Sequence, residues 1–418
     1  MDLRRTILHF FPDLFARLEA VVDPRTRHDY TMTEILLGGI FMFSVKQGSR
    51  NEMNLERSKG DFAANFERLF GKCLPHMDTI DDVLRALEDG ELERLKAALV
   101  ASLIEKKVFG KCRLLGRINR VAVDATGVFS VPEGHCDHCL RRESSTGTVS
   151  FFHNVLEAKL ITPNGFAISL ATEWIENTEV YLKQDCELKA FRRLAEKLKT
   201  YFPRLPICIH ADGLYPNKPF FDLCRDKGWH FIVTLKDASL KTLWDDVEME
   251  LLTSTNERRV VKDGKEQAYR WLCQLVYQGV ELSWIECCET KGGKTTRFVH
   301  VTDLTVDADN VVELAESGRM RFMIENEGFN TLKHQGYALE HKYSRTSYAA
   351  AKNYVSLMHI AHLINQLYER SQLFRPLLVA KMTVKHLWKE LVSALSGTVI
   401  DASGLAPAAM DRFQIRFG

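Results

Sequence analysis

An aspartate interrupts a short apolar run at residues 121–124, and this feature limits what the chain can fold into more than any other. Val121, Ala122 and Val123 are apolar, with a β-branched residue at each end, and Asp124 follows them directly. A short continuous apolar run is typical of a buried central strand. Because an unpaired buried carboxylate costs several kcal/mol or more, we expect Asp124 to be neutral, paired or bound to a metal ion.

A second strand-like run, Ile207–Leu214, carries Asp212 in the same way. Two buried strands that each present one aspartate predict that both acids meet at one cation. His210 comes two residues before Asp212, so the two side chains share a face in a regular strand. His210 is therefore either a partner of that acid or a satisfied core residue.

Composition and length bound the class of protein. A chain of 418 residues predicts two or three domains, and a hydrophobic content of 45% is enough for buried cores. The net charge of +1 means that a site for a polyanion has to be a local patch. Met1–Phe15 lacks the apolar segment of a signal peptide, and the longest apolar run, Ile35–Val45, is too short to span a bilayer. Ten cysteines, several in apolar runs, indicate reduced thiols, so we expect a cytoplasmic protein with no membrane partner.

The spacing of apolar residues divides the chain into five parts. Residues 1–116 are predicted to be helical, and either a packing domain or a nucleic-acid docking domain is consistent with them. Residues 117–238 read as β-β-β-α-β-α-β, which indicates a mixed sheet with helices on its faces. We expect a β-rich insertion at 239–310, a helical second part of the core domain at 311–370 and a helical tail at 371–418.

The individual elements follow from periodicity and from turn signals such as Asn164-Gly165. Alternation and β-branched runs predict the strands, and an apolar stripe at helical spacing predicts the helices. The expected elements are strands Arg120–Ser130, Phe151–Ile161 and Ala167–Ile175, helix Lys183–Tyr201, strand Ile207–Leu214, helix Lys218–Lys227, strands His230–Leu235, Tyr269–Cys288 and Thr295–Asp303, and helices Val311–Lys333 and Tyr343–Arg370.

A third acid with the character of a ligand lies in the helix predicted over Arg319–Gly336. At roughly 100° per residue, Glu325 shares a face with Phe329 and Leu332, so it is expected to point to the sheet. Glu327 points elsewhere and is the weaker candidate. Carboxylate oxygens are hard ligands that select Mg²⁺ or Mn²⁺, with water and phosphate in the remaining positions.

The order strand-Asp, strand-Asp, helix-Glu on this scaffold resembles the DDE transposases of bacterial insertion sequences. The stretches that carry the resemblance are VAVDATGVFS, HADGLYPNKPFFDLC followed by HFIVTLKD, and RFMIENEGFNTLKHQGYALEH, and the match extends from about Met32 to Tyr368. The long gap before Glu325 is similar to the subgroup with a β domain inserted there. The resemblance implies an α/β fold, with a ribonuclease-H-like mixed sheet flanked by helices, an N-terminal helical domain and a β-rich insertion.

The subgroup also has a helix signature that reads tyrosine, two residues, arginine, three residues, glutamate, six residues, lysine. Arg321 and Glu325 match it, Gly318 stands at the tyrosine position, and Lys333 comes one residue later than the pattern requires. By this resemblance, Arg321 and Lys333 contact DNA phosphate near a transposon end.

The implied activity is that of a DNA transposase that cleaves insertion-sequence ends and transfers the 3′-hydroxyls to target DNA. Asp124 with Asp212, and Asp124 with Glu325, would hold two Mg²⁺ or Mn²⁺ ions for phosphoryl transfer. The implied partners are double-stranded DNA of the transposon ends and target and a second copy of the chain in a homodimer, at the bacterial nucleoid. Two other hypotheses stay open: a nuclease of the same fold that does not join ends, and an inactive domesticated DNA-binding protein.

A separate group of possible metal ligands lies in the segment GHCDHCLRR. Cys136 and Cys139 have the spacing of half a zinc site, and His135, His138 and the distant His153 are candidates for the remaining ligands. Because no second cysteine pair follows, a polar loop with two free thiols is the alternative. A zinc ion here would be structural and would stiffen the loop between the first two strands.

Further candidates for DNA contact lie next to these motifs. Arg141 and Arg142 follow the second cysteine and could contact the DNA backbone. Tyr215 and Asn217 follow the second aspartate, where they either position a phosphate or base or only form the turn around Pro216. Contacts to phosphate supply affinity without reading the sequence.

Overall fold

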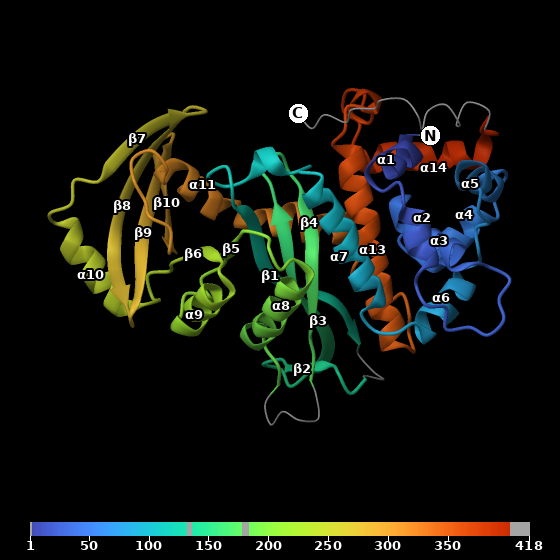
Figure 1. Cartoon of the computed structure of the whole chain (residues 1–418), viewed down its shortest axis with the longest axis horizontal. Helices are drawn as coiled ribbons and strands as arrows, with labels where there is room; N and C mark the ends of the chain where they lie inside the picture. Colours follow the sequence, from blue (N-terminus) through green and yellow to red (C-terminus); the bar gives the residue numbers. More distant parts are fainter. Residues whose placement is uncertain (1, 132–135, 178–183, 402–418) are drawn as a thin grey trace.

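The computed structural model describes residues 2–131, 136–177 and 184–401. Within these residues, ten strands form one sheet, whose path runs β2-β3-β1-β5-β6-β10-β9-β8-β7, with β4 also paired to β3. Figure 1 shows this sheet beside the helices of the N-terminal third of the chain. The strands are β1 Asn119–Val131, β2 Leu140–Glu143, β3 Val149–Ile161, β4 Ala167–Ile175, β5 Ile207–Ala211, β6 His230–Thr234, β7 Glu257–Lys262, β8 Lys265–Tyr277, β9 Val280–Lys291 and β10 Lys294–Thr302.

The central part of the sheet is mixed. Strand β1 pairs antiparallel with β3, which places Asp124 opposite Glu157, and β3 pairs antiparallel with β4. On its other side β1 runs parallel to β5, and β5 runs parallel to β6. Helices lie on both faces, so the predicted α/β class with a mixed sheet flanked by helices is confirmed (Figure 1).

The strands of the predicted insertion continue the same sheet. Strand β10 pairs antiparallel with β6, with Val301 opposite Val233. The expectation of one strand over Tyr269–Cys288 is wrong, because the chain turns at Gln278 and Gly279, both at positive φ, to form the β8–β9 hairpin. The short edge strand β2 was not expected.

The helix predicted over Val311–Lys333 is interrupted between Met320 and Phe329, whereas the other predicted helices begin and end close to where periodicity places them. Thr31 caps α3 through a capping box with Glu34, and Gly90, in the left-handed region, separates α6 from α7. The helices are α1 Asp2–Phe10, α2 Leu14–Glu19, α3 Met32–Ser44, α4 Arg50–Arg57, α5 Phe62–Phe70, α6 Met77–Ala86, α7 Glu91–Glu105, α8 Glu187–Tyr201, α9 Lys218–Lys227, α10 Lys241–Leu251, α11 Val311–Arg319, α12 Asn330–His334, α13 Tyr348–Glu369 and α14 Val384–Gly397, with short turns η1 Gly110–Cys112, η2 Met320–Phe322, η3 Ile324–Phe329 and η4 Arg375–Leu377.

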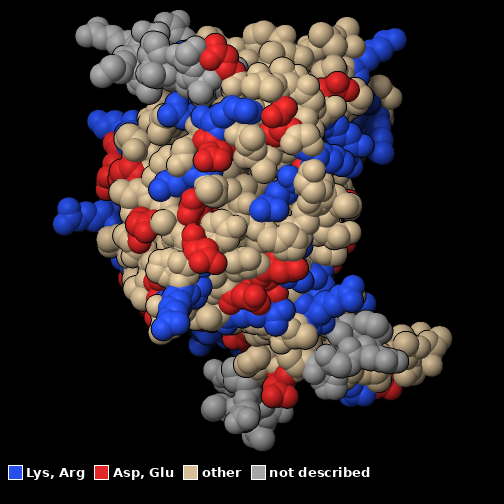
Figure 2. All heavy atoms as spheres, turned by 90° about the vertical axis from the view of Figure 1, so that its right-hand side faces the viewer, with Lys and Arg blue, Asp and Glu red and all other residues tan. Residues whose placement is uncertain are grey.

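Helix α13 joins the N-terminal helices to the sheet. It is buried along most of its length and packs against α3, α6, α7 and β4, and it lies between the two parts of the molecule in Figure 1. Figure 2 views the helical side, where lysines and arginines are interspersed with aspartates and glutamates. This face therefore presents no single-sign field to a polyanion.

Three sequence expectations fall outside the described residues: His135, the start of the helix predicted at Lys183, and the chain beyond residue 401. None of the helices in the described ranges combines the length and apolar character needed to cross a bilayer.

Candidate active site

Asp124 and Glu325 converge on one guanidinium group. Nη1 of Arg321 lies 3.0 Å from Oδ2 of Asp124, and Nη2 lies 2.9 Å from Oε1 of Glu325. The Asp124 side chain is 21% exposed and that of Glu325 is 48% exposed. Two acids that are far apart in the sequence are therefore brought to one positive group beside β1.

The segment that carries Glu325 is not a regular helix. After α11 the chain forms a 3₁₀ turn, η2, and then a π-helical turn, η3, which contains Glu325. The expectation that Glu325 shares a regular helical face with Phe329 and Leu332 is therefore wrong: those two are buried, whereas Glu325 is about half exposed. π turns are rare in proteins overall, and those that do occur are often found at functional sites.

The π turn accounts for the position of Lys333. A single π turn accommodates one extra residue, which offsets the following helix by roughly 100°. In a regular helix, a lysine seven residues after the glutamate would point within roughly 20° of the glutamate's direction. With the offset of the π turn, Lys333, eight residues after Glu325, points in that same direction. Its ammonium group pairs with Glu340 at 2.9 Å. The one-residue delay of Lys333 relative to the signature is thus offset by the wider π turn.

Gly318, at the tyrosine position of the signature, lies against the His300 ring. A Cβ atom added at Gly318 would lie 2.6 Å from His300 carbon and nitrogen atoms, so no side chain fits there without displacing the imidazole. The His300 ring is 3% exposed, and its Nδ1 has no hydrogen-bond partner among the described residues. An imidazole from β10 therefore occupies the space that a side chain at Gly318 would need.

Asp212 lies just beyond the end of β5 and not inside a strand as expected. Its Oδ1 accepts a hydrogen bond from the Leu214 backbone N–H at 2.8 Å, which fixes the turn. Its Oδ2 lies 3.9 Å from Nζ of Lys236. His210 points away from this acid, because its Nε2 lies 3.3 Å from the Ser317 hydroxyl in the core, so its second role, as a core residue, is the correct one.

A fourth acid, Glu187, belongs to the same cluster and was missed in the sequence. It is the first residue of α8, and its Oε1 accepts a hydrogen bond from the Tyr215 hydroxyl at 2.7 Å. Burial raises the pKa of Glu187, Tyr215 lowers it, and the charge of Asp212 raises it further. The sequence shows only an acid in the first turn of a charged helix, where the helix dipole commonly favours one, so no local signal separates it from a surface residue.

The cluster holds an excess of negative charge. Burial raises the pKa of Asp124 to about 6; among its neighbours, Arg321 lowers this pKa whereas Glu325 and Glu187 raise it. A carboxyl group with a raised pKa surrounded by other acids is stabilised by any cation that it contacts. Such an arrangement is common at functional sites.

The carboxylates of Asp124, Asp212 and Glu325 do not form one compact group of ligands. In the described part of the chain, ligand atoms of three such side chains come within 4.8 Å of one another only at Cys136, Cys139 and His153. The acids are thus not gathered around one point. An all-carboxylate donor set is what Mg²⁺ and Mn²⁺ prefer.

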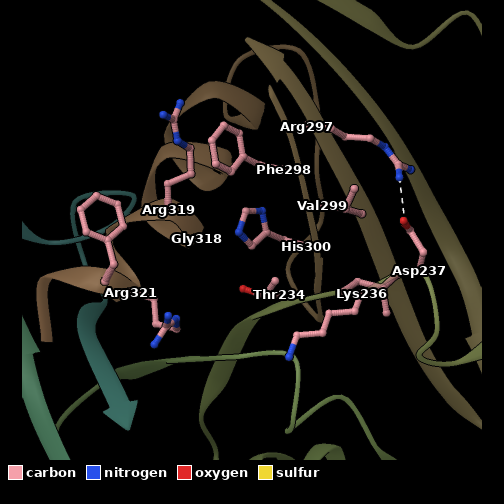
Figure 3. A pocket seen from close by; sticks show the side chains of 12 residues that line it. Thr234, Lys236, Asp237, Arg297, Phe298, Val299, His300, Gly318, Arg319 and Arg321 are labelled. Atoms are coloured by element: carbon pink, nitrogen blue, oxygen red, sulfur yellow. Dashed lines mark hydrogen bonds and ion pairs between the residues drawn. The ribbon is translucent and has the colours of Figure 1, made fainter. Parts of the chain in front are cut away.

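A pocket of about 410 Å³ adjoins the acids. It lies between β6, β10 and the α11–η2 segment, and Figure 3 shows His300 at its centre beside Gly318. The side chains of Lys236 and Arg321 extend toward the same edge of the pocket in that view. Its cationic lining residues are Lys236, Arg297, Arg319 and Arg321, each of which also pairs with a carboxylate.

The remaining residues predicted to contact DNA, Tyr215, Asn217, Arg141 and Arg142, do not line this pocket. Tyr215 is fully buried, so the expectation that it positions a phosphate or base is wrong; its hydroxyl instead orients Glu187. Asn217 caps α9 by accepting a hydrogen bond from the Phe220 N–H at 3.0 Å. Arg141 and Arg142 are exposed on β2, which pairs with the end of β3 distant from Asp124.

The predicted sulfur-rich group does assemble. Sγ of Cys136 lies 3.6 Å from Sγ of Cys139, and both thiols approach Nε2 of His153. His138 is not part of this group, although its ring stacks on Tyr348 with centroids 5.2 Å apart. The sequence therefore identified three of the residues that meet here.

Comparisons with known proteins find similarity among solved structures alone. No family model matches the chain, and no curated protein matches it. Among solved structures, the chain is similar to the piggyBac transposase synaptic complex with hairpin DNA, with 10% sequence identity, a TM-score of 0.45, and coverage of 99% of this chain and 82% of that one.

Proposed function

We propose that this chain is a metal-dependent DNA transposase of the DDE type, which cleaves the ends of a bacterial insertion sequence and joins their 3′-hydroxyls to target DNA. The observation that carries the proposal is the convergence of Asp124 and Glu325 on Arg321, with Asp212 at the end of the neighbouring strand. The motif order in the sequence supports the same assignment.

The acids and the basic residues have separate roles in this proposal. Asp124 would hold both cations, Asp212 would hold one of them and Glu325 would hold the other. Divalent ions bound there would supply the activation of a water or a 3′-hydroxyl and the neutralisation of charge on the scissile phosphate. Arg321 turns from the carboxylates to the DNA backbone, since a guanidinium binds phosphate as readily as carboxylate.

The pocket beside the acids positions the DNA in this proposal. Lys236, Arg297 and Arg319 exchange their present carboxylate partners for phosphate oxygens, and Lys333 contacts the same strand from α12. Each exchange costs an existing ion pair, so the affinity is expected to fall steeply as salt concentration rises. Cutting two ends together requires two protomers, so a homodimer forms on the DNA.

The direct test uses the full chain and DNA that carries the inverted repeats flanking its gene. With Mg²⁺ and a supercoiled plasmid target, we expect strand cleavage at the repeat ends and covalently joined products, both abolished by EDTA. Cleavage without joined products would identify the nuclease alternative. DNA binding without cleavage at any tested Mg²⁺ or Mn²⁺ concentration would identify an inactive DNA-binding protein.

Glu187 acts on the metal ligands without holding an ion. Glu187→Gln keeps the oxygen that accepts from Tyr215 but removes a negative charge near Asp124 and Asp212, so the concentration of Mg²⁺ giving half-maximal cleavage should rise about tenfold. The maximal rate at saturating Mg²⁺ should stay close to that of the wild type. The control is Glu196→Gln on the same helix, where the glutamate pairs with Lys227. An unchanged Mg²⁺ dependence for Glu187→Gln would remove this residue from the site.

A further inference from the structure

Two thiols and an imidazole nitrogen form a compact triangle at the far end of β3. The distances are 3.6 Å between the sulfurs of Cys136 and Cys139, and 3.3 Å and 3.1 Å from those sulfurs to Nε2 of His153. In a tetrahedral zinc site, with the usual bond lengths, the corresponding edges are about 3.8 Å for S···S and about 3.5 Å for S···N. The three atoms need to separate by only a few tenths of an ångström to accept the ion.

The surrounding structure aims the three ligand atoms at one point. The His153 ring is held between the rings of Phe129 and Tyr348, at centroid distances of 4.8 and 4.5 Å. Cys136 and Cys139 are brought together by a turn in which the Cys139 N–H donates to the Cys136 carbonyl at 3.1 Å. The geometry is therefore set by the backbone and by ring packing, so little rearrangement is needed on binding.

Two members of the triangle are buried, and Cys136 is partly exposed. His153 is 1% exposed and Cys139 is 5% exposed. Nδ1 of His153 has no hydrogen-bond partner among the described residues, so no protein contact opposes the tautomer that leaves the Nε2 lone pair available. Thiolate and imidazole ligands select Zn²⁺ and not Mg²⁺, which separates this site chemically from the carboxylate cluster.

We propose that Cys136, Cys139 and His153 bind one Zn²⁺ ion, with a water molecule in the fourth position. The ion replaces the two thiol protons, which pass to solvent, and no oxidant is involved. It fastens the turn that precedes β2 to β3, and so fixes the strand that carries Arg141 and Arg142. The role is structural, because His153 lies opposite Phe129, five residues along β1 from Asp124, roughly 17 Å for an extended strand.

The test measures metal in the purified full chain. Elemental analysis after dialysis against metal-free buffer should give one zinc per chain, and Co²⁺ substitution should give the thiolate-to-cobalt charge-transfer absorption. Cys136→Ser and Cys139→Ser should lose the zinc and this absorption. His138→Ala is the matched control, since His138 lies in the same turn but outside the triangle, and it should keep both.

Three results would overturn the proposal. One is a wild-type chain without zinc that also gives no thiolate-to-cobalt absorption. Another is a disulfide between Cys136 and Cys139 in chain purified under reducing conditions, and the third is full zinc retention in Cys136→Ser. The cobalt spectrum of the wild type decides the question even if a variant fails to fold. Because no DNA is present, the outcome is independent of the proposed transposase activity.

Discussion

Asp124→Asn is expected to slow DNA strand cleavage by about a thousandfold or more, which corresponds to about 4 kcal/mol of transition-state stabilisation. The amide has the size of the carboxylate but no charge, so neither cation of the proposed pair is held. The fold should survive, because the substitution relieves an acid whose pKa burial raises to about 6. Single-turnover cleavage of a labelled transposon end gives the rate, and gel shift gives the DNA affinity, which should stay within a fewfold of the wild type.

Two further substitutions, at Glu325 and Glu327, test which glutamate of this segment is the ligand. Glu325→Gln should reduce cleavage as strongly as Asp124→Asn. Glu327→Gln, two residues along the same segment, should retain most of the activity, because Glu327 pairs with Arg370 at 2.7 Å. If Glu327→Gln were inactive and Glu325→Gln active, the wrong acid would have been assigned.

Glu157→Gln is expected to lower the free energy of unfolding by about 3–5 kcal/mol. Glu157 is fully buried, and its Oε2 accepts hydrogen bonds from Nζ of Lys159 at 3.1 Å and from the Ser169 hydroxyl at 2.7 Å. Lys159 is also fully buried, so the neutral amide leaves its charge uncompensated. The Lys159 side chain lies 3.0 Å from where a Cβ of Gly328 would be, so the Glu157–Lys159 pair packs against the π turn that carries Glu325.

Urea denaturation at pH 7 measures the loss of stability, and a double variant isolates its cause. Glu157→Leu combined with Lys159→Met removes both charges and should recover much of the stability lost by the single substitution. If the double variant were less stable than Glu157→Gln by a further several kcal/mol, packing and not charge pairing would explain the effect.

The stability difference between the wild type and Glu157→Gln is expected to depend on pH in one direction. Burial alone raises the pKa of Glu157, but the charges of His359, Lys159 and Lys96 outweigh it and hold the pKa at about 2. Since burial keeps the pKa of His359 well below 6.5, the two lysines supply the charge at neutral pH. The stability contribution is complete above the unfolded pKa of about 4.5 and is lost as pH falls toward 2. The difference between wild type and Glu157→Gln should therefore shrink below about pH 4.5.

The strands were predictable because their chemistry is local. The β-branched run at Val121–Val123 predicts a buried strand wherever it lies, and the structure buries it in β1. The edge strand β2 was missed because Leu140–Glu143 is mostly charged and is a strand only through its pairing with β3. The β8–β9 turn was missed because apolar residues continue on both sides of Gln278 and Gly279.

The residues of the candidate site could be named from the sequence, whereas their geometry could not. The order of Asp124, Asp212 and Glu325 could be read from the chain, whereas periodicity assumes 3.6 residues per turn and therefore cannot register a π turn. Glu187 reaches the cluster only because α8 begins beside the end of β5, through the contact of Glu187 with Tyr215. Long-range placement of this kind leaves no trace in a local pattern.

The most direct measurement of the central claim is the position of Mn²⁺ in crystals of the full chain bound to transposon-end DNA. The account predicts two anomalous-scattering peaks, both within about 2.2 Å of Asp124 oxygens, one also bound by Asp212 and the other by Glu325. Crystals that contain DNA and Mn²⁺ but show no peak at Asp124, from protein that cleaves the same DNA in solution, would contradict it.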